Sequence, residues 1–422
     1  MTATDTHRAI EAVWRIESAR LIAGLTRIVR DVGIAEELAQ DALVAALEQW
    51  PDSGIPRNPG AWLMATAKHR AIDFLRRGTL ITHKHEDLGR EMAEREMLVP
   101  DLAAAMDDNI GDDLLRLVFI ACHPVLSSEA RVALTLRLLG GLTTDEIARA
   151  YLVAEPTIAQ RIVRAKRTLA EARVPFEIPR GAEFTARLAS VLQVIYLIFN
   201  EGYSATSGHD WMRPVLCEDA LRLGRILVEL VPKEPEVHGL VALMEIQASR
   251  SRARVGASGV PILLLDQDRT QWDQLLIHRG LAALDRAEQL GKKRGTYAIQ
   301  AAIAACHARA ASAEDTDWTR IVALYSELME VAPSPVVELN RAVALGMASG
   351  PAAGLELVDA LSSDPSLRGY HLLPSVRGDL LQKLGRIEEA CAEFERAASM
   401  TRNAPECQLL LERARNCGDG RE

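Results

Sequence analysis

The sequence predicts an all-α protein, with two small helical modules followed by a helical C-terminal domain that contains repeated helix pairs. Three observations lead to this prediction. Apolar residues recur at steps of three and four along most of the chain, which places them on one face of a helix. Proline, glycine and capping residues interrupt these stretches at helix-like lengths. The run from Phe184 to Phe199 is almost wholly apolar, which predicts a helix buried among its neighbours.

The composition is that of an ordinary globular protein. The chain has 422 residues, of which 48% are hydrophobic and 25% charged, and its length suggests about two to four domains. No apolar run approaches the ~18 residues of a membrane span, and the N-terminus is polar where a signal peptide is apolar. Six cysteines are scattered without CxxC spacing, which argues against a disulfide framework or a zinc site. We therefore expect a cytoplasmic protein without a membrane segment.

The charge is distributed unevenly along the chain. The net charge is −9 overall, zero over 1–78, −7 over 79–113, +4 over 114–180 and −6 over 181–422. The acidic stretch is typical of a solvated linker. The basic stretch is a candidate for contact with nucleic acid, because a basic surface can occur within an acidic protein. The second half as a whole is a poor candidate for binding phosphate.

Proline positions divide the first part of the chain into helices. The helical spacing predicts Thr6–Ile28, about Ala35–Gln49, about Ala61–Arg77, Leu114–Leu126 and Ser128–Leu139. Trp50-Pro51 is expected to end the second of these, and 51–59 is a loop rich in proline and glycine. His123-Pro124 separates the last two, because a residue before proline disfavours helix.

Residues 143–173 predict a helix-turn-helix. Thr143 and Glu146 have the spacing of a capping box, which predicts the start of a short helix. After a turn at 152–154, Pro156 suits the first position of a longer basic helix that runs to about Arg173.

The two faces of this longer helix differ. A buried stripe is expected at Ile158, Ile162, Ala165 and Leu169. The opposite face consists of Pro156, Thr157, Gln160, Val163, Arg164 and Arg167. Glutamine can pair with adenine and arginine with guanine, while Arg161, Lys166 and Arg173 on the flanks can hold phosphates. With five basic residues and one acidic residue over 161–173, we favour DNA binding over the alternative, an ordinary charged surface helix.

Three segments of the first half resemble a known family. The third segment in chain order is GLTTDEIARAYLVAEPTIAQRIVRAKRTL. It resembles region 4 of the extracytoplasmic-function group of bacterial sigma factors. Region 2.2 is similar to AEELAQDALVAALEQW, and regions 2.3 and 2.4 are similar to NPGAWLMATAKHRAIDFLRR. The wider pattern resembles the subgroup with a tetratricopeptide-like C-terminal extension, on the segments LVFIACHPVLSSEARVALTLRLLGGL, LLLDQDRTQWD and AIAACHARA.

The resemblance implies an alternative sigma factor. Its partners would be core RNA polymerase, through the beta-prime clamp helices and the beta flap, and promoter DNA. The implied division is 1–78 as region 2, 79–113 as acidic linker, 114–180 as region 4, 181–312 as a helical extension and 313–422 as tetratricopeptide-like repeats. In the family this linker threads the polymerase cleft, so its acidity suits a mimic of nucleic acid.

The resemblance also implies three sets of binding residues. Core polymerase would bind Glu36, Glu37, Gln40 and Asp41, which we expect to be exposed on one helix; a solvated acidic face is the alternative. The −10 element would be contacted by Trp62, Lys68, His69, Arg70, Arg76 and Arg77. The −35 element would be contacted by Thr157, Gln160, Arg161, Arg164, Lys166 and Arg167. Trp62 fits a core position better, and the family usually has asparagine where His69 stands, so its −10 preference does not transfer.

The last hundred residues predict helix pairs. Helices are expected over Ser375–Leu384 and Ile387–Ser399. Small and large residues fall at tetratricopeptide positions, namely Gly378, Gly385, Ala390, Phe394 and Ala397, with a weaker copy at Ala342, Ser349, Gly354 and Val358. Such pairs form a concave surface, which would hold either a protein partner or a segment of the same chain.

No motif in the sequence predicts an enzyme. A nucleophile elbow, a P-loop and a dinucleotide fingerprint are all missing, so we expect no catalytic residue, no cofactor and no metal. In and after the segment LDQDRTQWD, Ile277 stands where a calcium loop that starts at Asp266 needs glutamate. We expect Asp266, Arg269 and Asp273 to form salt bridges that cap a helix or hold this domain against the first-half modules, and surface packing without function is the alternative. The alternative functions are a helix-turn-helix regulator that does not replace sigma, and a protein-binding scaffold.

Overall fold

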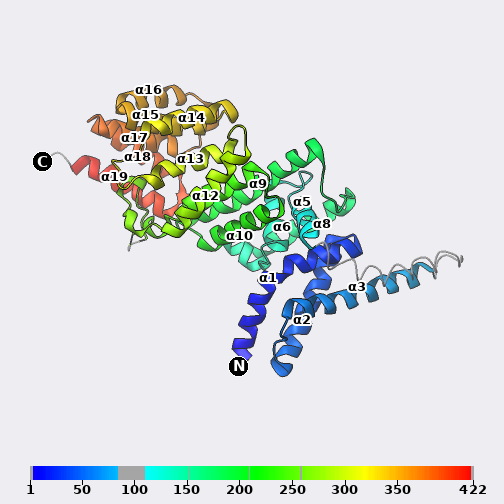
Figure 1. Ribbon diagram of the computed structural model, residues 1–422. Helices are drawn as coiled ribbons and strands as arrows, with labels where there is room; N and C mark the ends of the chain where they lie inside the picture. The colour runs from blue at the N-terminus through cyan, green and yellow to red at the C-terminus, as the bar shows by residue number, and fades with distance from the viewer. Residues whose placement is uncertain (1–2, 84–109, 152, 209, 257–258, 420–422) are drawn as a thin grey trace. The chain divides into compact units, whose positions relative to one another are not determined.

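The computed structural model describes residues 3–83, 110–151, 153–208, 210–256 and 259–419. The chain divides into two compact units, Met1–Ile195 and Tyr196–Glu422. Helices make up nearly all of the regular structure in both units (Figure 1). The prediction of an all-α protein is therefore confirmed.

The first unit contains two groups of helices. The α1–α3 module consists of α1 (Ala3–Val29), α2 (Val32–Ser53) and α3 (Pro59–His83). The α5–α8 module consists of α5 (Ile110–Ala121), α6 (Ser128–Leu138), α7 (Thr144–Tyr151) and α8 (Glu155–Glu171). The helix α9 (Gly181–Tyr203) begins in this unit and ends in the second. Most of the acidic stretch, 84–109, lies outside the described residues.

Several helix bounds differ from the sequence prediction, and two of the differences lie near prolines. Pro51 does not end α2, which continues to Ser53. Proline in the last turn removes only its own N–H, and the N–H of Gly54 still donates to the carbonyl of Trp50 at 3.0 Å. Helix α5 ends at Ala121, five residues before the predicted end. Pro124 disfavours a helical conformation at His123, and the helix ends before it reaches this residue.

Small side chains allow the helices of the first module to pack closely. The buried face of α2 carries Ala35, Ala39, Ala42, Ala45 and Ala46. Helix α1 packs against α2 and α3 and also against α5. It therefore contributes to the packing of both modules, with Leu21, Ile22 and Leu25 at most 2% exposed.

The capping box is confirmed at the start of α7. The Thr143 N–H donates to Glu146 Oε2 at 2.8 Å, and the Glu146 N–H donates to the Thr143 hydroxyl at 3.1 Å. Glu146 also accepts a hydrogen bond from Arg15 of α1 at 2.6 Å. Burial opposes ionisation of Glu146, but these hydrogen bonds and the charge of Arg15 outweigh it and hold the pKa of the carboxyl below its usual value.

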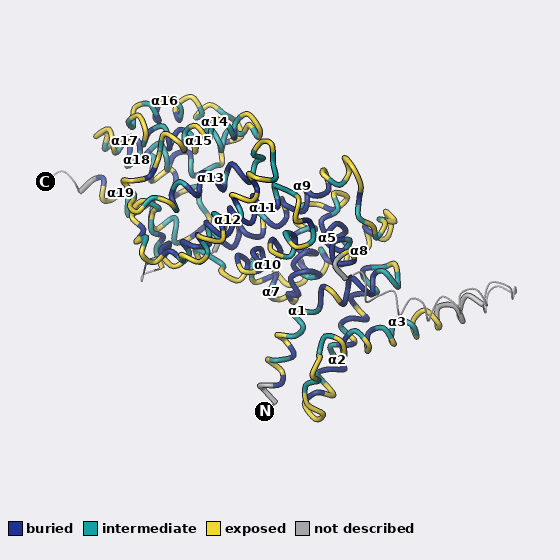
Figure 2. Tube along the Cα trace, viewed as in Figure 1, coloured by how far each residue is buried: buried dark blue, intermediate teal, exposed yellow. Residues whose placement is uncertain are grey.

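The second unit is a succession of helices with two very short strands. Its longer helices are α10 (Pro214–Leu230), α11 (Pro235–Ala248), α12 (Gln274–Leu290), α13 (Thr296–Arg309), α14 (Trp318–Val331), α15 (Pro335–Ser349), α16 (Pro351–Leu361), α17 (Leu372–Lys383), α18 (Ile387–Met400) and α19 (Ala404–Asp419). Short 3₁₀ turns are η1 (Ser251–Ala253), η2 (Leu264–Asp266), η3 (Arg269–Gln271) and η4 (Pro365–Leu367). Figure 2 shows α11 and α13 buried over most of their length, which makes them the centre of this unit.

The predicted helix pairs near the C-terminus are present as α15–α16 and α17–α18. Gly378 permits the close approach within the second pair, because a Cβ there would lie 2.8 Å from the ring of Phe394. Any larger residue at this position would push the two helices apart.

The strands depart from an all-helical expectation. The two-residue strands β1 (Ser207–Gly208) and β2 (Arg402–Asn403) pair in parallel. The Asn403 side chain is 1% exposed, and its Nδ2 donates to the carbonyls of Ala205 and Asp210 at 3.0 Å each. A buried amide with both donors used explains why the strands form there.

Helix α9 is long and apolar enough, by composition, to cross a membrane, although the sequence holds no unbroken apolar run of that length. It is the single helix among the described residues that meets this test, and half of the residues in its apolar window are buried in the protein. A core helix has the same composition.

Candidate nucleic-acid interface

Helix α8 presents a buried face and an exposed face. The buried residues are those that the spacing predicts, Ile158, Ile162, Ala165 and Leu169. The opposite face is exposed at Pro156, Thr157, Gln160, Val163, Arg164 and Arg167. Val163 keeps 62% of its surface exposed although it is apolar. We refer to α8 as the recognition helix.

The cations of the recognition helix differ in their surroundings. Arg164 is exposed and Arg161 is half-buried. Arg167 donates from Nε to Glu171 at 2.6 Å, and because both side chains are largely exposed this pair stabilises little. Lys166 differs from the rest, because its ammonium forms an ion pair with Glu36 of α2.

Glu36 is at the centre of a buried ionic cluster between the two modules. Its side chain is 4% exposed. One carboxylate oxygen accepts hydrogen bonds from Arg137 Nε and Gln40 Nε2, each at 2.6 Å, and the other forms the ion pair with Lys166. The expectation that Glu36 is exposed is therefore wrong, because two cations of the α5–α8 module bind it. We call Glu36, Arg137 and Lys166 the Glu36 cluster.

Two further ion pairs join the modules. Arg15 of α1 lies 2.6 Å from Glu146 of α7. Arg27 of α1 lies 3.2 Å from Asp113 of α5, whose side chain is 3% exposed and also accepts from Arg116 at 2.6 Å. Burial raises the pKa of Asp113 despite these two cations. The contact between the modules therefore has ionic links at three separate places.

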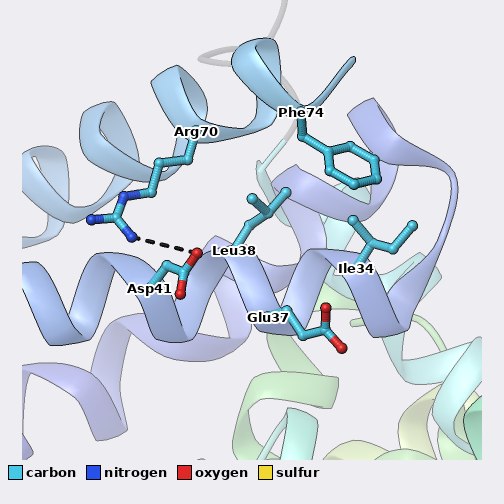
Figure 3. Close-up of a pocket in the computed structure, with 6 residues that line it drawn as sticks. All are labelled: Ile34, Glu37, Leu38, Asp41, Arg70 and Phe74. Atoms are coloured by element: carbon cyan, nitrogen blue, oxygen red, sulfur yellow. Dashed lines mark ion pairs between the residues drawn. The ribbon is translucent and has the colours of Figure 1, made fainter. Parts of the chain in front are cut away.

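A pocket of about 350 Å³ lies between α2 and α3. Figure 3 shows its lining, which consists of Ile34, Glu37, Leu38 and Asp41 from α2 and Arg70 and Phe74 from α3. Arg70 Nη1 lies 3.4 Å from Asp41 Oδ2. Acidic groups thus stand beside an apolar surface that includes Phe74, which is 40% exposed.

The structure separates the four predicted polymerase-binding residues into two pairs. Glu37 and Asp41 line the pocket, whereas Glu36 is bound by the α5–α8 module and Gln40 donates to it. Residues four apart share a helix face, and adjacent residues are turned by ~100°. The sequence analysis missed the apolar lining at Ile34, Leu38 and Phe74, because apolar residues that line a pocket look like core positions when only the spacing is known.

The residues predicted for the −10 element lie along α3. Trp62 is half-buried, with its ring centroid 5.3 Å from that of Trp50 at an interplanar angle of 69°. Lys68 is half-buried, and His69 and Arg76 are exposed. Arg70 is half-buried and paired with Asp41. The side chain of Arg77 lies outside the described residues.

Metal coordination has no candidate site in the described ranges, where no group of three or more histidine, cysteine, aspartate or glutamate side chains is suitably placed.

Three known families match parts of the chain. Sigma-70 region 2 matches residues 16–80, and Sigma-70, region 4 matches residues 116–169. A family of unknown function (DUF6596) matches residues 187–288. The first two matches cover most of the α1–α3 module and most of the α5–α8 module.

Similar proteins are found in several bacteria. An uncharacterized protein of Rhizobium meliloti is 44% identical over 391 residues, which cover 92% of this chain and 91% of that protein. A probable ECF RNA polymerase sigma factor, SigI, of Mycobacterium tuberculosis is 26% identical over 168 residues, which cover 40% of this chain and 57% of SigI. The ECF RNA polymerase sigma factor SigK of a Mycobacterium species is 27% identical over 165 residues, which cover 36% of this chain and 77% of SigK.

Two sigma-70 regions stand in the expected order on two helical modules, and the second module carries an exposed recognition helix. The chain therefore belongs to the extracytoplasmic-function group of sigma-70 factors, as an alternative sigma factor for promoter recognition that carries a C-terminal extension.

Proposed function

We propose that the recognition helix reads the −35 element in the major groove. The observation that carries this proposal is its exposed face, which presents Gln160, Arg164 and Arg167 on a helix anchored by a buried stripe. Glutamine and arginine are the residues that pair with adenine and guanine edges. Arg161, on the flank, would contact phosphates and set the register. Thr157 lies at the N-terminal end, where contacts with base edges are usual.

The −10 element would be opened by the loop 54–58 and α3. His69 and Arg76 are exposed on this helix and would contact the separated strand. Trp62 packs edge-on against Trp50 and would support the loop that receives an extruded base.

The α2–α3 pocket would bind the beta-prime clamp helices of core polymerase. Glu37 and Asp41 provide negative charge beside the apolar side chains of Leu38 and Phe74. This combination suits a partner that offers basic and apolar groups on a helical surface. Of the four predicted residues, only Glu37 and Asp41 would contact the clamp helices, because Glu36 and Gln40 face the α5–α8 module.

The Glu36 cluster would hold the unbound protein in a closed arrangement. Lys166 cannot neutralise a DNA phosphate while its ammonium is paired with Glu36. We propose that binding of core polymerase favours an arrangement in which the modules separate and free Lys166. A protein that must open before it binds has a lower apparent affinity, in proportion to the open fraction.

The remaining parts would serve the same function. The α5–α8 module would also contact the beta flap, and the acidic stretch 79–113 would occupy the polymerase cleft. The helix pairs α15–α16 and α17–α18 would act as tetratricopeptide-like repeats that bind a protein partner or another segment of this chain. The protein would not be an enzyme itself and would act in the cytoplasm, where the polymerase is.

Reconstituted transcription tests the function as a whole. Purified protein added to core polymerase on linear DNA should direct initiation at one promoter sequence. A helix-turn-helix regulator would bind duplex DNA but would leave core polymerase unable to start at that site. Specific binding to duplex without initiation would therefore contradict the proposal.

Substitutions in the recognition helix separate base contacts from phosphate contacts. Gln160→Ala and Arg164→Ala should each cost ~1–3 kcal/mol at one base pair of the −35 element and relax the preference there. Arg161→Ala should weaken binding equally on all sequences, because a phosphate contact carries no sequence information. Holoenzyme binding to a panel of single-base −35 variants measures both effects. An equal loss on every sequence for all three variants would show that the assigned face is wrong.

Charge reversal at the pocket tests the polymerase contact. Glu37→Lys should weaken binding to core polymerase without unfolding the protein, because Glu37 is exposed at the pocket. Glu48→Lys is the matched control, since Glu48 is also exposed on α2 but does not line the pocket. Titration of labelled core polymerase gives the affinity, and a thermal melt verifies the fold. If both variants bind as the wild type does, the pocket is not the contact.

An isosteric change in the Glu36 cluster tests the closed arrangement. Glu36→Gln should speed hydrogen exchange in α2 and α8 of the free protein and strengthen binding to core polymerase, because Arg137 and Lys166 lose their counter-charge. Glu129→Gln, at an exposed glutamate on α6, should change neither. Weaker polymerase binding by Glu36→Gln with unchanged exchange would instead mean that Glu36 contacts polymerase directly.

A further inference from the structure

A stack of arginine and aromatic side chains lies inside the second unit. We call Arg250, Arg254 and Arg269 the arginine cluster. The guanidinium carbon of Arg254 lies 3.4 Å from the ring centroid of Tyr203, and that of Arg250 lies 5.8 Å from the same centroid. On its other side Arg250 lies 5.8 Å from the ring centroid of Trp272, which Arg269 approaches to 4.9 Å. Arg250 and Arg254 are each 8% exposed.

The arginine cluster lacks an acidic ion-pair partner among the described residues. In the part of the chain that the structure describes, no carboxylate forms an ion pair with any of its three members. Other arginines of the same unit are paired with glutamate, as Arg213 is with Glu201 and Arg225 with Glu245. Buried charges in proteins are normally paired, because removing an isolated charge from water is costly. Aromatic rings compensate only part of this cost.

The nearby histidine responds to this uncompensated charge. His307 is 7% exposed, and burial together with the charges of Arg250 and Arg269 lowers its pKa to about 4. The imidazole is therefore neutral at physiological pH and adds no charge to the three arginines. The charge of Asp315 acts on Arg269 without forming an ion pair with it.

Two buried donors, one in the arginine cluster and one on the neighbouring Trp272, also lack an acceptor among the described residues. Among the described residues, nothing accepts a hydrogen bond from Arg250 Nε or from the indole N–H of Trp272, a side chain that is 4% exposed. Other donors of the three arginines are used within the protein. Arg250 Nη2 donates to the Tyr203 hydroxyl at 2.7 Å and to Gln247 Oε1, and Arg254 Nη1 donates to the Tyr203 carbonyl. Arg269 donates to the carbonyls of His307 and Ala310 at 2.7 Å and to the Thr316 hydroxyl at 3.2 Å. Arg269 thus contributes charge, while Arg250 and Trp272 have donors available for a ligand.

We propose that Arg250, Arg254 and Trp272 form a binding site for a small molecule that carries a phosphoryl group. Phosphoryl oxygens accept bidentate hydrogen bonds from guanidinium groups, and their charge of nearly −2 offsets more of the cluster than one carboxylate would. The small exposed fraction of Arg250 and Arg254 favours a compact ligand over a protein surface. The site lies within the segment matched by a family of unknown function.

This site gives the extension a function beyond promoter recognition. The second half of the chain has a net charge of −6, so its average charge conceals a local positive site. A ligand bound there would stabilise the turns η1 and η3 against the end of α9, and the extension would then respond to the concentration of a phosphorylated metabolite.

Calorimetric titration of the full chain with inorganic phosphate, at fixed ionic strength, tests the site. We expect saturable binding at one site per chain. Arg254→Gln should weaken the binding about tenfold or more, since it removes one charge-assisted bidentate contact. Arg254→Lys keeps the charge but loses the planar fork, and Trp272→Phe keeps the ring but loses the N–H, so each should bind more weakly than wild type. Arg279→Gln, an exposed arginine on α12, should bind as wild type does.

Three outcomes would overturn the proposal. The first is the absence of saturable phosphate binding by the folded wild-type chain. The second is an equal affinity in Arg254→Gln, Trp272→Phe and Arg279→Gln. The third is binding of acetate in preference to phosphate, which would identify the cluster as a receptor for acidic side chains. A thermal melt of each variant, with and without phosphate, separates loss of binding from loss of folding.

Discussion

The arrangement of the first unit depends on one buried carboxylate. Glu36 is shared by Arg137 and Lys166, so a single acidic side chain forms ion pairs with two cations of the other module. Removing one partner of such a buried group leaves an uncompensated charge, which typically costs ~3–5 kcal/mol. An apolar contact would tolerate small displacements, whereas this ionic contact requires all three side chains in place. The modules therefore have one well-defined closed arrangement.

Neighbouring positions on α2 have different surroundings because of helix geometry. Glu36 faces the α5–α8 module, and Glu37, the next residue, lines the pocket with Asp41. The ~100° turn between adjacent residues places the two carboxylates on separate faces of one rigid element. A force on the pocket side of α2 is thus transmitted to the Glu36 cluster through a helix rather than through a loop. With core polymerase bound at the pocket, as we propose, this helix would connect polymerase binding directly to the state of the recognition helix.

Local sequence patterns predicted the recognition helix well. Its buried stripe at Ile158, Ile162, Ala165 and Leu169 and the capping box at Thr143 depend on residues within four positions of one another. The family, the order of the modules and most helices followed from similar local signals. The continuation of α2 past Pro51 was not predicted. The presence of a proline does not reveal whether the last turn of a helix tolerates the loss of one hydrogen bond.

The interactions that were missed all join residues far apart in the sequence. Glu36 and Arg137 are separated by 101 positions, and nothing near Glu36 in the sequence distinguishes it from the exposed Glu37. The arginine cluster combines side chains from segments on either side of η2. The negative net charge of the second half gave no indication of it. Net charge over a long segment describes solvation and steering, but it does not describe what the interior holds.

The side chain of Asn403 also affects how the second unit folds. It bonds to the carbonyl of Ala205, 198 residues earlier, while the helix pairs between them contact mainly their immediate neighbours. Pairs with low contact order form quickly, and a closure between distant positions requires most of the intervening chain to be ordered first. The β1 backbone therefore stays unpaired until the chain has been translated beyond Asn403.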